Sequence, residues 1–213
     1  FTGLKGLASH GAAFGILFAI WLFSRKKIHE MNYLQILDRI VIVVALTGAL
    51  IRLGNFFNSE IIGKPSNNPL SVVFINHVTE GLMDYRAQSN PSESIKVEKN
   101  KDLPQGANGR VPLNIYVFFK QGTRTEVANQ FLNSDMKYFL SYYTEFIDEP
   151  GIEPLKYEMI TESSGNLAAR VSTMGISRHP AQLYEAISCV VLFIVLFLMW
   201  YKDQKKLPTG RIF

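Results

Sequence analysis

The sequence predicts an α-helical, polytopic membrane protein with three spanning helices and an inserted extracytoplasmic α+β head domain. Two observations support this fold class. Three stretches, 6–24, 40–51 and 186–201, contain no Asp, Glu, Lys or Arg, and a long polar segment, roughly 64–178, separates the second from the third. A helix needs about 20 mostly apolar residues to cross a bilayer. The predicted domains are 1–63 (two helices), 64–177 (the head) and 178–213 (the third helix with its basic flank).

We predict the spanning helices at about 5–24, 34–56 and 180–201. The first reaches spanning length by itself, whereas the second does so only with Asp38, Arg39 and Arg52 near its ends. The alternative is a soluble protein with three buried helices. That alternative is weakest for residues 186–200, which are apolar on all faces.

Basic residues predict the orientation of these helices. Arg25, Lys26 and Lys27 follow the first helix, and Lys202, Lys205 and Lys206 follow the third. Short loops rich in Lys and Arg stay in the cytoplasm. We therefore expect a multi-pass membrane protein in which the first helix runs inward, the second outward and the third inward, so that the polar stretch 64–178 is extracytoplasmic. The net charge of +4 is explained by these flanks and requires no nucleic acid.

The polar insert predicts a small α+β domain. The expected elements are strands at 71–77, 111–119, 155–162 and 167–174, a mobile loop at 86–109, and a helix at 124–145 opened by a Thr123/Glu126 capping box. Asn133, Ser134 and Asp135 are candidates for a break in that helix, and Gly165-Asn166 for a turn. The insert has no metal-ligand or nucleophile spacing. Cys189, the only cysteine, lies within the third helix, where we expect a packing role.

The second helix carries polar residues where it should leave the membrane. Arg52, Asn55 and Glu60 share one helical stripe with Gly63 if the helix continues that far, and Asn58 lies off the stripe. An ionisable group at membrane depth is costly and normally faces a partner or a wet cavity. Arg52 alone could instead snorkel to lipid phosphates, but snorkelling explains neither the amides nor the carboxylate.

Two further polar clusters occur at the same predicted depth. His10 lies near the outer end of the first helix, where an interfacial histidine bonded to a neighbour is an equal alternative. The third helix begins with "SRHPAQLYE", which supplies the polar residues Arg178, His179, Gln182, Tyr184 and Glu185. For Tyr184 alone, a place in the interfacial aromatic belt is a strong alternative.

We expect these three clusters to converge in one cavity at the outer membrane boundary. Such a cavity combines cations, a histidine that titrates near neutral pH and a hydrocarbon floor. A phospholipid head group with its acyl chains left in the bilayer fits that shape and charge. Arginine can hold a phosphate with two parallel hydrogen bonds, and histidine is a natural proton acceptor.

At these residues the sequence resembles the bacterial prolipoprotein diacylglyceryl transferases. "RLGNFFNSEIIG", 52–63, is similar to the family's signature segment, "HGAAFG", 10–15, to its His-Gly-Gly segment, and "RHPAQLYE", 178–185, to its His-Pro-x-Gln-Leu-Tyr-Glu segment. The resemblance covers roughly 1–75 and 176–213. Ile51 and Ala12 depart from the family pattern, which usually has Gly at both positions.

The resemblance implies a transferase that moves a diacylglyceryl group from phosphatidylglycerol to the lipobox cysteine of a prolipoprotein. It implies that His10 and Arg52 are catalytic: His10 accepts the thiol proton and Arg52 binds the lipid phosphate. The implied substrate-binding residues are Asn55, Asn58, Glu60, Gly63, Arg178, His179, Gln182, Tyr184 and Glu185. The family requires no metal, nucleotide or other cofactor.

Two alternatives to the transferase stay open. One is a non-catalytic membrane protein whose external domain binds a partner, and the other is an enzyme that transfers a lipid group to water or an alcohol. The chain begins without Met and stops at "LPTGRIF", so we expect it to be a fragment. The resemblance places a further functional arginine on a helix after Phe213.

Overall fold

The structure is a computed structural model that describes residues 7–26, 31–86, 88–149, 153–161, 165–203 and 208–213, with side chains in α1 described from Gly11 onward and in α6 up to Lys202. The chain divides into two compact units. The first, unit 1, comprises Phe1–Leu53 and Tyr184–Phe213, and the second, unit 2, comprises Gly54–Leu183.

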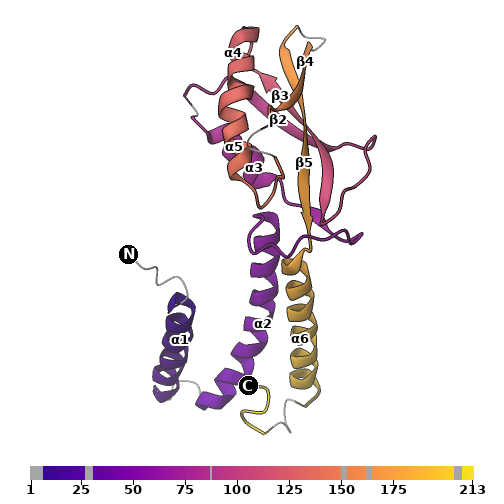
Figure 1. Ribbon diagram of the computed structural model, residues 1–213. Helices are drawn as coiled ribbons and strands as arrows, with labels where there is room; N and C mark the ends of the chain where they lie inside the picture. The colour runs from indigo at the N-terminus through magenta and orange to yellow at the C-terminus, as the bar shows by residue number, and fades with distance from the viewer. Residues whose placement is uncertain (1–6, 27–30, 87, 150–152, 162–164, 204–207) are drawn as a thin grey trace. The chain divides into compact units, whose positions relative to one another are not determined.

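Unit 1 is built from long apolar helices (Figure 1). They are α1 (Leu7–Arg25), most of α2 (Tyr33–Phe57) and most of α6 (Ala181–Asp203). All three confirm the predicted helices at 5–24, 34–56 and 180–201. Two described helices are long and apolar enough to cross a membrane, at Tyr33–Phe57 and Ala181–Lys202. Together with the sheet domain they fit a membrane protein with a head domain, and the third span stays a prediction.

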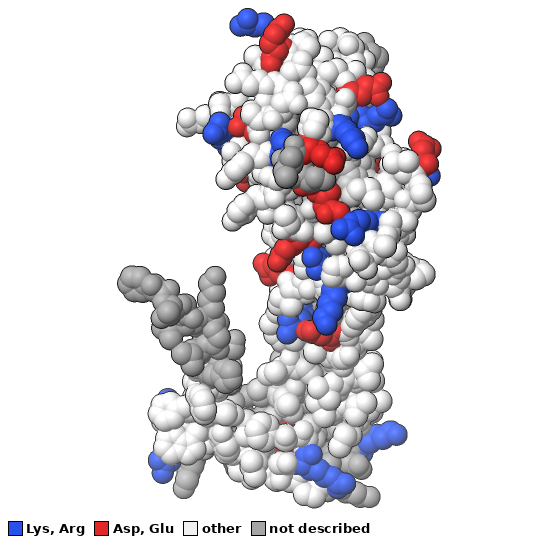
Figure 2. Space-filling model, viewed as in Figure 1, with Lys and Arg blue, Asp and Glu red and all other residues white. Residues whose placement is uncertain are grey.

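The helices of unit 1 expose most of their apolar side chains. Figure 2 shows mostly uncharged surface along the shafts of α2 and α6. Phe14, Val43 and Ile187 are more than 60% exposed, an arrangement that suits lipid and not water. Cys189 faces Gly48 of α2, where a Cβ would lie 3.5 Å from its Sγ, so the cysteine sits in a helix–helix contact.

The carboxylate of Asp38 ties the C-terminal segment to α2. It accepts hydrogen bonds from the backbone N–H groups of Gly210 (2.7 Å), Ile212 (3.0 Å) and Phe213 (2.9 Å). Gly210 adopts a left-handed conformation (φ 83°), and Ile212 is buried. One charged side chain therefore satisfies three backbone donors near the start of α2.

Unit 2 is an antiparallel sheet covered on one face by helices (Figure 1). The strand order is β1-β5-β3-β2, with β4 also paired to β5. The strands are β1 (Val72–Val73), β2 (Ser92–Lys99), β3 (Arg110–Phe119), β4 (Lys156–Thr161) and β5 (Leu167–Arg178). The helices are α3 (Asn76–Asp84), α4 (Thr125–Gln130), the π-helical η1 (Phe131–Met136) and α5 (Lys137–Tyr142).

The core of unit 2 lies between the sheet and these helices. Alternate residues of β3 point into it and are buried, namely Val111, Leu113, Ile115, Val117 and Phe119. Ala169 and Val171 of β5 and Leu132, Met136 and Leu140 of the helices complete its centre. A polar pair also lies inside: Lys137 Nζ is 3.2 Å from Glu149 Oε1, and both side chains are nearly buried.

The structure corrects three of the elements predicted in the head. Residues 92–99 of the predicted loop form β2, because Ile95 and Val97 pack against the core while charged neighbours face solvent. The strand predicted at 71–77 is only Val72–Val73, since α3 begins at Asn76. The predicted helix 124–145 ends at Tyr142 and widens into a π-helix at 131–136 instead of breaking.

The predicted capping box is also wrong. The N-cap of α4 is Arg124, which makes no side-chain capping bond, and the Thr123 hydroxyl donates backward to Lys120 O at 2.7 Å. The strand predictions at 111–119, 155–162 and 167–174 are confirmed by β3, β4 and β5, although β5 extends four residues further, to Arg178. That extension carries the chain directly to α6.

Candidate functional site

The helix α2 ends at Phe57 in a Schellman motif. The N–H of Glu60 bonds Asn55 O (2.9 Å) and the N–H of Ser59 bonds Phe56 O (3.1 Å). Ser59 occupies the left-handed position (φ 56°) that glycine normally fills. The predicted helical stripe through Glu60 and Gly63 is therefore wrong, because this motif turns the chain out of the helix before those residues.

The chain then folds closely against the start of α6. Ile61 is also left-handed (φ 54°), a rare conformation for a β-branched residue. At Gly63, an added Cβ would lie 3.0 Å from His179 Cβ and closer still to the His179 carbonyl oxygen. The Gly63 N–H donates to that carbonyl at 3.1 Å, and the His179 N–H donates to Lys64 O at 3.1 Å. Only glycine fits this approach.

Two side chains from the end of β5 and the start of α6 clamp this turn. Arg178 donates from Nη1 to Gly63 O (3.0 Å) and from Nε to Glu145 O (2.9 Å). Gln182 donates from Nε2 to Glu60 O. These bonds join three segments, 60–63, 145 and 178–182, that are far apart in sequence.

Gln182 is polar and almost completely buried, at 1% exposed. Its amide nitrogen is bonded to Glu60 O, whereas its Oε1 is buried without a partner among the described residues. A buried polar oxygen of this kind normally has a hydrogen-bond donor, so Oε1 is a ready acceptor for one.

In unit 1, Arg52 forms an ion pair with Glu185. The Nε of Arg52 lies 2.6 Å from Glu185 Oε2, and the two side chains are 35% and 47% exposed. This contact joins α2 to α6 and brings two predicted site residues together. The contact is made by Nε, and a guanidinium carries two further nitrogens that can donate hydrogen bonds.

The predicted site residues are thus distributed over both units. Arg52, Tyr184 and Glu185 belong to unit 1, and Asn55, Asn58, Glu60, Gly63, Arg178, His179 and Gln182 belong to unit 2. His10 lies in α1, but its side chain is outside the described residues. The convergence of His10, Arg52 and Tyr184 in one cavity stays a prediction. The residue roles within that cavity stay predictions as well.

Sequence reasoning missed three residues that shape this region. Ser59 is 5% exposed and supports the helix end, Ile61 holds the second left-handed turn, and the Glu145 carbonyl receives Arg178. The left-handed position at the end of α2 holds Ser59 and not the glycine or asparagine that usually occupies it, so the usual signal of a helix C-terminus is missing. Glu145 contributes only backbone, which no side-chain pattern reveals.

The family model for prolipoprotein diacylglyceryl transferase matches residues 2–213. Among curated proteins, the phosphatidylglycerol–prolipoprotein diacylglyceryl transferase of Tolumonas auensis is 55% identical over 69 residues, 32% of this chain and 26% of that protein. The protein of the same name from Porphyromonas gingivalis is 46% identical over 70 residues, 33% of this chain and 24% of the relative.

The matched segments span about a quarter of the length of these curated relatives. No solved structure matches the chain. The family match extends through the head domain and includes the three segments that carry the resemblance, which it confirms. The chain therefore belongs to the prolipoprotein diacylglyceryl transferase family.

Proposed function

We propose that the complete protein transfers the diacylglyceryl group of phosphatidylglycerol to the lipobox cysteine thiol of a prolipoprotein, the first step of bacterial lipoprotein maturation. The family match over residues 2–213 carries this proposal. The relatives' names give phosphatidylglycerol and prolipoprotein as substrates. The non-catalytic alternative has no such support.

The reaction needs a base and a cation. The substrate thiol loses its proton to His10, and its sulfur attacks the glycerol carbon that carries the phosphate ester. The C–S bond forms as the C–O bond breaks, and glycerol phosphate leaves with the electron pair. Its phosphate gains negative charge, so a cation at that oxygen stabilises the transition state more than the ground state.

Arg52 is suited to that cationic role. The ion pair of its Nε with Glu185 supports this role, because it restricts the guanidinium, and in this proposal the terminal nitrogens bind the lipid phosphate. In unit 2, Arg178 and Gln182 hold the 60–63 turn, which in turn presents Glu60. Asn55, Asn58, His179 and Tyr184 line the head-group site in this proposal.

The test uses the full-length protein in phosphatidylglycerol vesicles with a lipobox peptide. His10→Gln and Arg52→Ala should abolish thiol modification while the protein stays folded. Arg39→Ala is the matched control, because Arg39 is an exposed arginine of the same helix outside the proposed site. Normal turnover in both site variants would reject the proposed roles.

We also propose that the protein lies in the bacterial inner membrane with its head domain on the periplasmic side. The basic residues Arg25 and Lys202 at the helix ends support this orientation. Gln121 is exposed in a turn of the head. In a Cys189→Ser background, Gln121→Cys should react in intact spheroplasts with a maleimide that cannot cross membranes. Labelling only after lysis would reverse the assigned orientation.

A further inference from the structure

One end of unit 2 exposes three apolar side chains that nothing in the described structure covers. Phe57 is 65% exposed, Ile61 57% and Leu70 68%. Single exposed apolar residues are ordinary, but a group of large ones at one place marks a surface that contacts something other than water.

The register of the sheet places Leu70 at this end. Val72 pairs with Arg178 in antiparallel β1 and β5, so residues just before Val72 extend past the end of β5. The chain passes from that end into α6 at Ala181. Leu70 thus lies beside the point where a helix of membrane-spanning length departs.

Phe57 and Ile61 lie at the same end. Phe57 is the last residue of α2, the other helix of spanning length, and its carbonyl accepts a bond from Asn76 Nδ2. Ile61 follows within the turn that Gln182 clamps. The three residues therefore lie at the end of unit 2 where the chain enters from α2 and leaves into α6.

The backbone is built to present these side chains outward. The Leu70 N–H donates to Asn68 Oδ1 (2.9 Å) and the Ser71 N–H to Asn68 O (2.9 Å), so a hydrogen-bonded turn carries Leu70 at its tip. Ile61 adopts a left-handed conformation although its side chain is 57% exposed, so burial of that side chain does not offset the backbone strain. Solvation alone would favour polar residues at both positions.

Tyr142 and Lys64 lie near the same end of unit 2, and their residue types point to the same kind of surface. Arg178 bonds the carbonyl of Glu145, which brings the segment just after α5 to the end of β5, and Tyr142 of the last turn of α5 is 76% exposed. Lys64 is exposed next to Gly63. Tyrosine and lysine are favoured at the level of lipid head groups.

We propose that Phe57, Ile61 and Leu70 form a membrane-contact surface that inserts into the boundary between lipid head groups and acyl chains. The occupant is lipid because this surface is continuous along the chain with α2 and α6, which supply the spans. The head domain then rests on the bilayer instead of standing clear of it. This surface is independent of the proposed chemistry and of which side of the membrane the head occupies.

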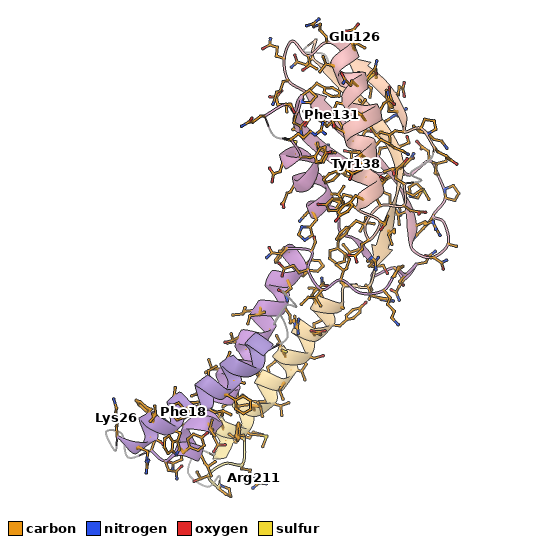
Figure 3. The ribbon with its side chains drawn as sticks, turned by 60° about the vertical axis from the view of Figure 1, so that its left-hand side comes forward. Phe18, Lys26, Glu126, Phe131, Tyr138 and Arg211 are labelled. Carbon is orange, nitrogen blue, oxygen red and sulfur yellow. The ribbon has the colours of Figure 1, made fainter. Side chains whose placement is uncertain are left out.

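The test measures the depth of single tryptophans in the full-length protein. In a Trp21→Phe, Trp200→Phe background, Leu70→Trp and Phe57→Trp are compared with Val127→Trp in vesicles whose acyl chains are brominated near the ester end. Val127 is a matched control, since it is 43% exposed on α4 and neighbours Glu126, which Figure 3 shows at the opposite end of the head from the last turn of α2.

We expect brominated lipid to quench both Leu70→Trp and Phe57→Trp strongly and to leave Val127→Trp unchanged, with aqueous iodide giving the reverse order. Equal iodide quenching of Leu70→Trp and Val127→Trp would overturn the proposal. So would shielding of Leu70→Trp that depends on the protein-to-lipid ratio, because a second copy or another protein would then cover it. A nitroxide on Leu70→Cys, with Cys189→Ser, repeats the measurement with a smaller side chain.

Discussion

Gly63 is a position where a single added methyl group should strongly destabilise unit 2. In Gly63→Ala, the new Cβ would lie 3.0 Å from His179 Cβ, 3.2 Å from its carbonyl carbon and closest to its carbonyl oxygen. These neighbours are mostly backbone, which cannot rotate away as a flexible side chain can. The turn 60–63 must therefore separate from the start of α6.

The free-energy cost of Gly63→Ala is the sum of the costs at each contact that this separation of the turn from α6 affects. Forcing a methyl group into a packed site costs about 1–3 kcal/mol. Separation also weakens the bond from Gly63 N–H to His179 O and that from Arg178 Nη1 to Gly63 O, each worth about 1 kcal/mol net. We expect a loss of about 2–5 kcal/mol in the free energy of unfolding, a large share of a typical domain's stability.

The assay is thermal unfolding of the detergent-solubilised protein, followed by protease susceptibility of the head domain. A loss of 3 kcal/mol corresponds to a fall in Tm of about 6–12 °C for a domain of this size. Gly54→Ala is the control, because a Cβ at Gly54 meets nothing within 4 Å and alanine favours a helix. If Gly63→Ala unfolds at the same temperature as Gly54→Ala, the close approach described here does not govern the stability of this region.

Three further predictions concern charged groups. Arg52→Lys should lower transfer activity about 10- to 100-fold in the full-length protein, because a compact ammonium lacks the planar, two-pronged geometry with which a guanidinium can hold a phosphate while paired with Glu185. A wild-type rate would contradict that geometry. Glu149→Gln should destabilise the head by about 3–5 kcal/mol, because it leaves Lys137 nearly buried without its carboxylate. Glu158→Gln, which removes the exposed ion pair between Glu158 and Arg170, should change the free energy of unfolding by less than about 1 kcal/mol. If Glu149→Gln and Glu158→Gln lower the free energy of unfolding equally in chemical denaturation, burial does not explain the difference between these ion pairs. Asp38→Asn should speed hydrogen exchange of the Ile212 amide, since a neutral amide is a weaker acceptor than a carboxylate, and unchanged protection would show that this segment is held by other contacts.

Several elements could be predicted because their signals are local. The apolar runs predicted α2 and α6 to within three residues at each end, since spanning length is a property of consecutive side chains. The β-branched and aromatic run at 111–119 likewise predicted β3. The segments around Arg52 and His179 indicated the family, which the match over the whole chain confirms.

Other elements depended on partners that the sequence does not reveal. Residues 92–99 have the polar composition of a loop, and they form β2 because β3 offers an edge and a core for Ile95 and Val97. The end of α2 was predicted correctly, but the polar stripe drawn beyond it assumed a continuing helix. Ser59 adopts the left-handed conformation there without the glycine that usually announces it.

The sequence by itself determined the two long apolar helices, the main strands of the head and the family, because apolar length, alternation and short motifs are written in neighbouring residues. Only the tertiary structure decided that Arg52 pairs with Glu185, and that Arg178 and Gln182 clamp the turn through Gly63. These contacts join residues more than 100 positions apart and often use a backbone carbonyl as the acceptor. Every residue carries such a carbonyl, so the chain must fold before one of them is selected.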